Sequence, residues 1–334
     1  MTRNGSSLGL NIFPLILINF NLIKNHPQFA GGFFIARKNL CYNIFNAMGI
    51  LTDNKIKELE LKANDIRQSI VDMLVQAGSG HTAGPLGMTD IFTAFYFHIL
   101  HHDPKNTSDP ERDRLILSNG HICPVLYATM AYSGYFPIEE LKTLRKFGSR
   151  LQGHPERQKL QGLENTSGPL GSGLSQASGI AYGARMDNKK FRVYCLMSDG
   201  ELDEGNSWEG AMFAGNNKLS NLTVVVDRNN IQINGMTERV MPLEPLRAKW
   251  EAFNFHVIEI DGHNMEDIVG AVEQAKAIYE KPTCIIAHTI PGKGIKGIEF
   301  DYLWHGKPPT KDEEKKFLQE LRTLRGQIEA GHVD

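Results

Sequence analysis

The sequence predicts a three-layer α/β fold, in which helices cover both faces of a mostly parallel sheet. This prediction rests on short apolar, β-rich runs between residues 114 and 287, several of them separated by helical patterns. Such alternation is typical of βαβ units, whose strands pair in parallel and are buried on both faces. The expected strands are Arg114–Leu117, Arg192–Met197, Leu222–Val226, Val257–Ile260 and Thr283–Ala287.

A long amphipathic helix is expected before the first strand. It begins at Asp53, and Gly78 stands where a helix stop is expected. Apolar residues recur between them at three- and four-residue spacing: Ile56, Leu59, Ala63, Ile66, Ile70, Met73 and Ala77. Since no internal repeat or low-complexity linker follows residue 50, we expect residues 48–334 to form one αβα domain.

Composition and charge narrow the function. The chain has 334 residues, of which 41% are hydrophobic and 22% are charged, as is usual for a globular protein. A formal net charge of −2 provides no broad basic field for nucleic acid or an anionic membrane surface. The cysteines form no C-x-x-C pair, which predicts small buried hydrophobes in a reduced, cytoplasmic compartment. They are Cys41, Cys123, Cys195 and Cys284.

The first 47 residues differ from the rest of the chain. They contain no Asp or Glu, and the apolar run 8–23 is interrupted by asparagines. These interruptions disfavour a transmembrane helix, and no clear cleavage site favours a targeting peptide. We therefore expect a leader that is either an extension or a wrongly included start, with the native start near Met48.

Oxygen-bearing side chains follow two expected strands. Asp199 follows the second strand and Asn229 follows the third, so both are expected at the carboxyl edge of the sheet, where the strand order reverses and ligands bind. A carboxylate and an amide oxygen suit Mg²⁺, which keeps positions for phosphate and water. Gly200 permits a close backbone approach, and a helix from Asn206 onward offers N–H groups to an anion. Taken singly, either motif is more often a turn or a cap.

The stretch from Ser198-Asp199-Gly200 to Asn229-Asn230 resembles the signature of thiamine-diphosphate enzymes, with Ser198 in place of the usual glycine. Further motifs resemble the N-terminal half of transketolase, in the same order, between about Met48 and Pro309. They are SGHTAGPLG (79–87), SNGH (118–121), GHPE (153–156), TSGPLGSGLSQASGIA (166–181) and WHGKPP (304–309). The resemblance implies the thiamine-diphosphate-binding fold.

The resemblance also implies the residues of the site. The metal, Mg²⁺ or another divalent cation such as Ca²⁺ or Mn²⁺, is expected on Asp199, Asn229 and the Ile231 carbonyl. Thiamine diphosphate is expected to contact the following residues: His121, Gly168, Pro169, Leu170, Asp199, Gly200, Asn229 and His305.

The expected catalytic histidines are His81, His121, His154 and His305. A lone histidine is more often a satisfied structural residue, but their occurrence in matching motifs favours catalysis. Glu204 and Glu209 resemble acidic residues of the family that join the two active sites and face a partner subunit. They could equally be favourable charges in the first turn of a helix.

The implied activity is transfer of a two-carbon ketol unit between sugar phosphates, as in the pentose phosphate pathway. The resemblance covers only the half that binds the diphosphate, so we expect a separate C-terminal subunit that supplies the pyrimidine-binding domain, in a heterotetramer. Whether Lys293 replaces a lysine that many relatives carry before a G-x-G stays open.

Two alternatives to this function also stay open. The chain could belong to another thiamine-diphosphate ketol transferase acting on an unusual sugar phosphate, or it could be a non-catalytic binding subunit of the same fold. A deoxyxylulose-phosphate synthase is disfavoured by GHPE and WHGKPP.

Overall fold

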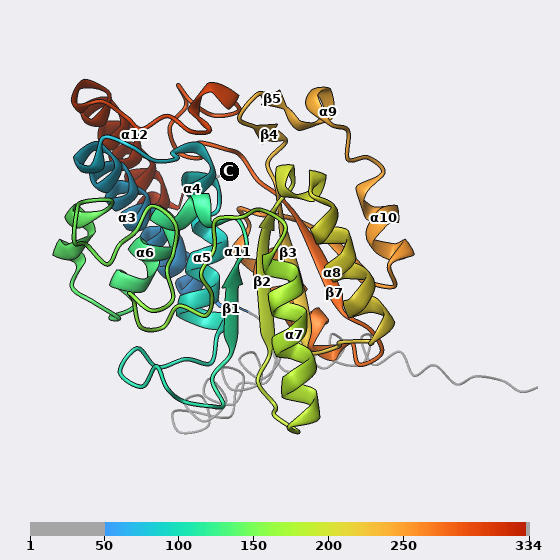
Figure 1. The fold of residues 1–334 in the computed structure, drawn as a ribbon. Coiled ribbons are helices and arrows are strands. Elements are labelled where there is room, and N and C mark those ends of the chain that lie inside the picture. Colours follow the sequence, from blue (N-terminus) through green and yellow to red (C-terminus); the bar gives the residue numbers. More distant parts are fainter. Residues whose placement is uncertain (1–50, 332–334) are drawn as a thin grey trace, which may run out of the picture. The chain divides into compact units, whose positions relative to one another are not determined.

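The computed structural model describes residues 51–331; residues 1–50, with the expected leader at 1–47, and residues 332–334 lie outside the described residues. Its centre is a parallel sheet of five strands in the order β1-β2-β3-β7-β6 (Figure 1). These strands are β1 Arg114–Leu117, β2 Val193–Ser198, β3 Leu222–Arg228, β6 His256–Asp261 and β7 Thr283–His288. All of the expected strands are therefore confirmed, with ends within two residues of the prediction. A short antiparallel pair, β4 Ile231–Gln232 and β5 Gly235–Met236, follows β3.

Helices connect these strands and flank the sheet. The α-helices are α3 Asp53–Ala77, α4 Ala83–Gly87, α5 Thr89–Ala94, α6 Cys123–Tyr132, α7 Gly173–Met186, α8 Gly205–Asn216, α9 Thr237–Val240, α10 Leu246–Ala252, α11 Met265–Ala277 and α12 Lys311–Ala330. Shorter 3₁₀ turns lie at Gly120–Ile122, Ile138–Thr143, Gly200–Asp203 and Tyr302–Trp304, and a π-turn lies at Phe95–Ile99.

The sheet is buried on both faces, which gives the three layers. In β2, Tyr194 and Leu196 join the core beneath α3, α5, α6, α11 and α12, whereas Val193, Cys195 and Met197 join the core beneath α7, α8 and α10. This alternation follows from the two-residue period of a strand. Figure 1 shows α7 and α8 on one side of the sheet and α3 with α12 on the other.

The ends of α3 have local causes. The Thr52 side chain accepts a hydrogen bond from the Lys55 amide at 3.3 Å and so caps the first turn. Gly78 ends the helix in the left-handed conformation, with φ of 62°. Both ends of the predicted helix are thereby confirmed.

Helix α8 makes a close backbone contact at Gly215. A Cβ atom at this position would overlap the carbonyl oxygen of Phe253, just after α10. The side-chain amide of Asn254 donates to the Gly215 carbonyl at 3.1 Å and secures the same contact. Only a residue without a side chain permits this approach.

The strand order follows the chain from β1 to β3 and then breaks, because β7 rather than β6 pairs with β3. The carboxyl ends of β1, β2 and β3 consequently lie together, next to this break. Over residues 51–331, the cysteines Cys123, Cys195 and Cys284 are free and buried, as expected. No helix within the same range has the length and apolar character needed to cross a membrane.

Candidate active site

A cavity of about 190 Å³ lies at the carboxyl edge of β1, β2 and β3. Several segments distant in sequence meet there, and several of the predicted site residues line it. These are His81, His121, Leu170, Gly200, Asn229, Ile231 and His305. The structure thus brings the histidine motifs and the strand-end motifs to one place.

The histidines form a contiguous cluster. The ring of His81 packs edge-on against His121, with centroids 5.1 Å apart, and against His305 at 5.4 Å. His154 extends the cluster, since its ring centroid lies 4.6 Å from that of His121. All the predicted histidines therefore lie within one connected group.

Burial keeps these imidazoles neutral at physiological pH. It lowers the pKa of His81 to about 3, with a further contribution from His305 and His121. Burial also lowers the pKa of His121 to about 4, and it lowers those of His154 and His305. A neutral imidazole can accept a proton from a bound hydroxyl, which a charged one cannot.

Asp199 is fully buried at the end of β2 and is held by several donors. Its Oδ1 accepts from the Gly200 amide at 2.7 Å. Its Oδ2 accepts from the Asn230 amide at 2.7 Å and from Arg228 Nη1 at 3.0 Å. Burial raises the pKa of Asp199 to about 6, and Arg228 opposes that rise. The carboxylate is therefore oriented before any ligand arrives.

Asn229 and Ile231 add oxygen atoms of a different kind. The Asn229 Oδ1 accepts from the Ile231 amide at 3.0 Å, and both residues line the cavity. Within residues 51–331 no group of three or more His, Cys, Asp or Glu could hold a metal ion. A cation at this edge must consequently use one carboxylate, an amide oxygen and a main-chain carbonyl, together with oxygens of a ligand. This hard-oxygen set suits Mg²⁺.

Unsatisfied polar atoms in the cavity also fit a polar ligand. His81 Nδ1 and Asn119 Oδ1 are buried without a hydrogen-bond partner in the described chain, and both residues line the cavity. Buried polar atoms normally have partners, so a bound group is the natural source of the missing bonds. The residues present thus fit a diphosphate ligand that carries polar ring atoms.

Glu201 is a functional candidate that the sequence did not reveal. It is fully buried and lines the cavity. Its Oε1 accepts from the Ser118 hydroxyl and from the Gly171 amide, the latter at 2.7 Å, and so joins the end of β1 to the glycine loop. Burial raises its pKa to about 7. Nothing in the sequence distinguishes this glutamate from the acidic residues that follow it on the same turn.

Other predicted residues lie outside the cavity. Gly168 contacts the His154 ring, where a Cβ would stand 3.5 Å from Cγ, and the neighbouring Pro169 is exposed. Glu204 and Glu209 are exposed at the start of α8. Their expected role at a subunit interface stays a prediction.

The helix expected to present its N-terminus to an anion begins at Gly205, and none of residues 204–207 lines the cavity. The reason is the intervening 3₁₀ turn Gly200–Asp203, whose first two residues line the cavity instead. The described chain therefore corrects this part of the expected diphosphate site.

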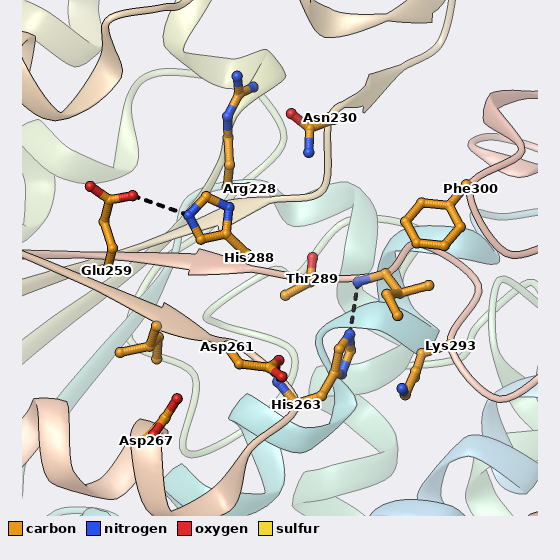
Figure 2. A pocket seen from close by; sticks show the side chains of 12 residues that line it. Arg228, Asn230, Glu259, Asp261, His263, Asp267, His288, Thr289, Lys293 and Phe300 are labelled. Atoms are coloured by element: carbon orange, nitrogen blue, oxygen red, sulfur yellow. Dashed lines mark hydrogen bonds and ion pairs between the residues drawn. The ribbon is translucent and has the colours of Figure 1, made fainter. Parts of the chain in front are cut away.

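Lys293 lies apart from the histidines. It lines a separate, more open cavity of about 690 Å³ beside the ends of β6 and β7, together with His263, Thr289 and Phe300 (Figure 2). The structure therefore gives no support to Lys293 as a replacement for the family's lysine at the histidine cavity.

Residues 59–324 match the family model described as transketolase, thiamine diphosphate binding domain. The match covers most of the chain. Fold and match together define a thiamine-diphosphate-binding α/β protein.

Curated relatives narrow this class. The chain is 44% identical over 264 residues to the 6-deoxy-6-sulfo-D-fructose transketolase subunit SqwG of Clostridium sp. (strain MSTE9), covering 79% of this chain and 96% of that one. It is 38% identical to one subunit of the apulose-4-phosphate transketolase of Phocaeicola vulgatus, covering 80% and 95%. Transketolase of Campylobacter jejuni has a similar structure, with a TM-score of 0.75 and 35% identity, over 80% of this chain and 42% of that one. The chain belongs to the transketolase family, as its N-terminal subunit.

Proposed function

We propose that this subunit, with thiamine diphosphate and a divalent cation, transfers a two-carbon ketol unit from a ketose phosphate to an aldose phosphate. The observation that carries the proposal is the cluster of neutral histidines at the same sheet edge as the oxygen donors of Asp199 and Asn229. Ketol transfer needs proton transfer beside an anchored diphosphate, and this arrangement combines the two requirements.

The chain's residues divide this work. Asp199, Asn229 and the Ile231 carbonyl would hold Mg²⁺, or Ca²⁺ or Mn²⁺ in its place, which would carry the diphosphate. When bound, thiamine diphosphate supplies the nucleophilic carbon. His81 and His305 accept the proton of the donor hydroxyl that is lost when the carbon–carbon bond breaks.

Two further histidines orient the reactants. His154 is assigned to the first hydroxyl of the donor, and His121 to the diphosphate. Because the pKa values of these imidazoles are lowered by burial, each enters the reaction as a base or as a neutral hydrogen-bond donor.

A separate C-terminal transketolase subunit completes the active site in this proposal, in a heterotetramer of two such pairs. Relatives that are themselves named subunits support it, since this chain covers 95 to 96% of their length. The partner would supply the pyrimidine-binding domain with the activating glutamate. The free, buried cysteines support a reducing, cytoplasmic compartment.

A second candidate keeps the chemistry and changes the sugar. Two relatives are named for 6-deoxy-6-sulfo-D-fructose and for apulose 4-phosphate, which favours a ketol transferase for an unusual acidic sugar. The histidine cavity serves either donor, because it handles the ketol end common to both.

The test measures ketol transfer from xylulose 5-phosphate to ribose 5-phosphate, by the chain alone and with a C-terminal transketolase subunit of the same organism. We expect activity only in the mixture, and loss of at least about 100-fold in Asp199→Asn, because the cation loses its carboxylate. Asp203→Asn, an exposed carboxylate on the same turn, is the matched control. Full activity of the chain alone contradicts the split assembly. Activity of the mixture only with sulfofructose or apulose 4-phosphate selects the second candidate.

A further inference from the structure

The amide of Asn229 is held in one orientation by partners on both of its ends. Its Oδ1 accepts from the Ile231 amide at 3.0 Å, and its Nδ2 donates to Asp227 Oδ2 at 2.7 Å. An amide has an acceptor end and a donor end, so a half-turn of the side chain would present N–H groups to a cation. The contact with Asp227 opposes this half-turn.

Asp227 is itself held from a neighbouring strand. It lies at the end of β3 with an exposed fraction of 1%, and its Oδ1 accepts from the Thr289 hydroxyl, just after β7. An ionised carboxylate only accepts hydrogen bonds, so the two donors, Thr289 and Asn229, each occupy one of its oxygens. Thr289 is also buried, at 5% exposure, and it lies where β3 and β7 run in register.

The backbone beside Thr289 is anchored to the helical layer. His263 Nε2 accepts from the Ile290 amide at 2.7 Å, which requires that the proton reside on Nδ1 (Figure 2). His263 Nδ1 donates to Asp90 Oδ2 at 2.7 Å. Asp90 is buried and accepts from Arg67 Nη1 of α3 at 3.0 Å.

We propose that Thr289 and Asp227 are positioning residues that keep the Asn229 oxygen directed at the cation, with His263 and Asp90 anchoring Thr289 to the helices. This inference rests on the proposed function, because it takes Asn229 as a metal ligand. Hydrogen bonds behind a metal ligand orient it, and their loss commonly weakens metal binding by about 10- to 100-fold. The chain of contacts spans α3, α5, β6, β7 and β3.

The test compares Thr289→Val with Thr289→Ser in the complex with the C-terminal subunit. Valine keeps the shape and lacks the hydroxyl, whereas serine keeps the donor. Mn²⁺ is titrated at a saturating concentration of thiamine diphosphate, and the free ion is followed by its electron paramagnetic resonance signal. We expect Thr289→Val to bind Mn²⁺ about 10- to 100-fold more weakly, and Thr289→Ser to bind it within about threefold of the wild type.

A second readout separates positioning from a merely structural role. The thermal midpoint of each cofactor-free variant is measured with the metal removed. Weaker Mn²⁺ binding by Thr289→Val, beyond what its midpoint explains and rescued by serine, supports the proposal. Wild-type Mn²⁺ binding by Thr289→Val overturns it, and so does equal weakening by both variants. If the wild type binds Mn²⁺ and cofactor without ketol transfer, the proposed function fails while this inference stands. If the wild type takes up no Mn²⁺, both fail.

Discussion

At the scale of single residues, the chemistry of the cavity depends on burial without charge. His81 is the central member of the cluster, since it contacts both His121 and His305, and its Nδ1 lacks a partner in the described chain. Packing several imidazoles together disfavours a positive charge on any of them, because each proton would repel the next. The cluster is therefore a reservoir of neutral bases.

This has a consequence for stability. Burial lowers the pKa of His81 to about 3, below its ordinary value of 6.5, so the unfolded chain binds this proton at higher pH than the folded chain. The folded-state preference contributes stability above pH 6.5 that is lost as the pH falls toward 3. We therefore expect the free energy of unfolding to fall less between about pH 7 and pH 5 in His81→Asn than in the wild type.

The measurement is urea unfolding of the cofactor-free protein at both pH values. His101→Asn, which replaces an exposed histidine outside the cavity, controls for the loss of a histidine as such. An unchanged pH dependence in His81→Asn would refute the assignment of His81 as a buried neutral base.

At the scale of elements, the site depends on helices that reach the sheet from distant parts of the chain. Helix α12 packs its buried Phe317, Leu321 and Ile328 inward, and Asn64 of α3 donates to the Leu321 carbonyl at 3.0 Å. A capping box begins α12, in which the Thr310 side chain accepts from the Glu313 amide and Glu313 accepts from the Thr310 amide at 2.8 Å. This cap lies directly after the His305 motif.

Thr310→Ala should lower the free energy of unfolding by about 1 kcal/mol, because the first turn loses a side-chain acceptor. Thr310→Ser should stay within a few tenths of a kcal/mol, since serine caps as well as threonine does. Urea unfolding of the two variants provides the comparison. A loss as large in serine as in alanine would show that the threonine methyl group, rather than the cap, stabilises this end.

The elements were largely predictable, and the site only in part. Period-two apolar runs and the Gly78 stop give the strands and α3 because burial and capping act locally in sequence. Glu201, Asp227 and Thr289 escaped prediction because their roles come from contacts across strands. A buried glutamate and an exposed one look alike in the sequence, so only the folded chain distinguishes Glu201 from Asp203.

At the scale of the whole molecule, the chain contributes one side of an active site. The described cavity brings together histidines and oxygen donors, whereas the proposed partner contributes the pyrimidine side. A ligand held between two chains binds each of them weakly alone, because much of its surface then remains in water.

Thiamine diphosphate with Mg²⁺ should therefore raise the thermal midpoint of the mixture far more than that of either chain by itself. A ligand at 100 times its dissociation constant stabilises by roughly 2.7 kcal/mol, which a thermal scan detects readily. Differential scanning fluorimetry of the two separate chains and of their mixture gives the comparison. An equal shift for the chain alone would mean that the cofactor site is complete within it.

The contact of Gly215 with the Phe253 carbonyl bears on how variation in this protein should be read. Every amino acid other than glycine carries a Cβ, so every replacement collides with a backbone atom, which cannot move aside as a flexible side chain can. A library of variants screened for function should find position 215 as intolerant as His81, although no substrate or cofactor is expected there. Ranking positions by intolerance alone would count this glycine among the catalytic residues, and only the geometry of the contact separates the two causes.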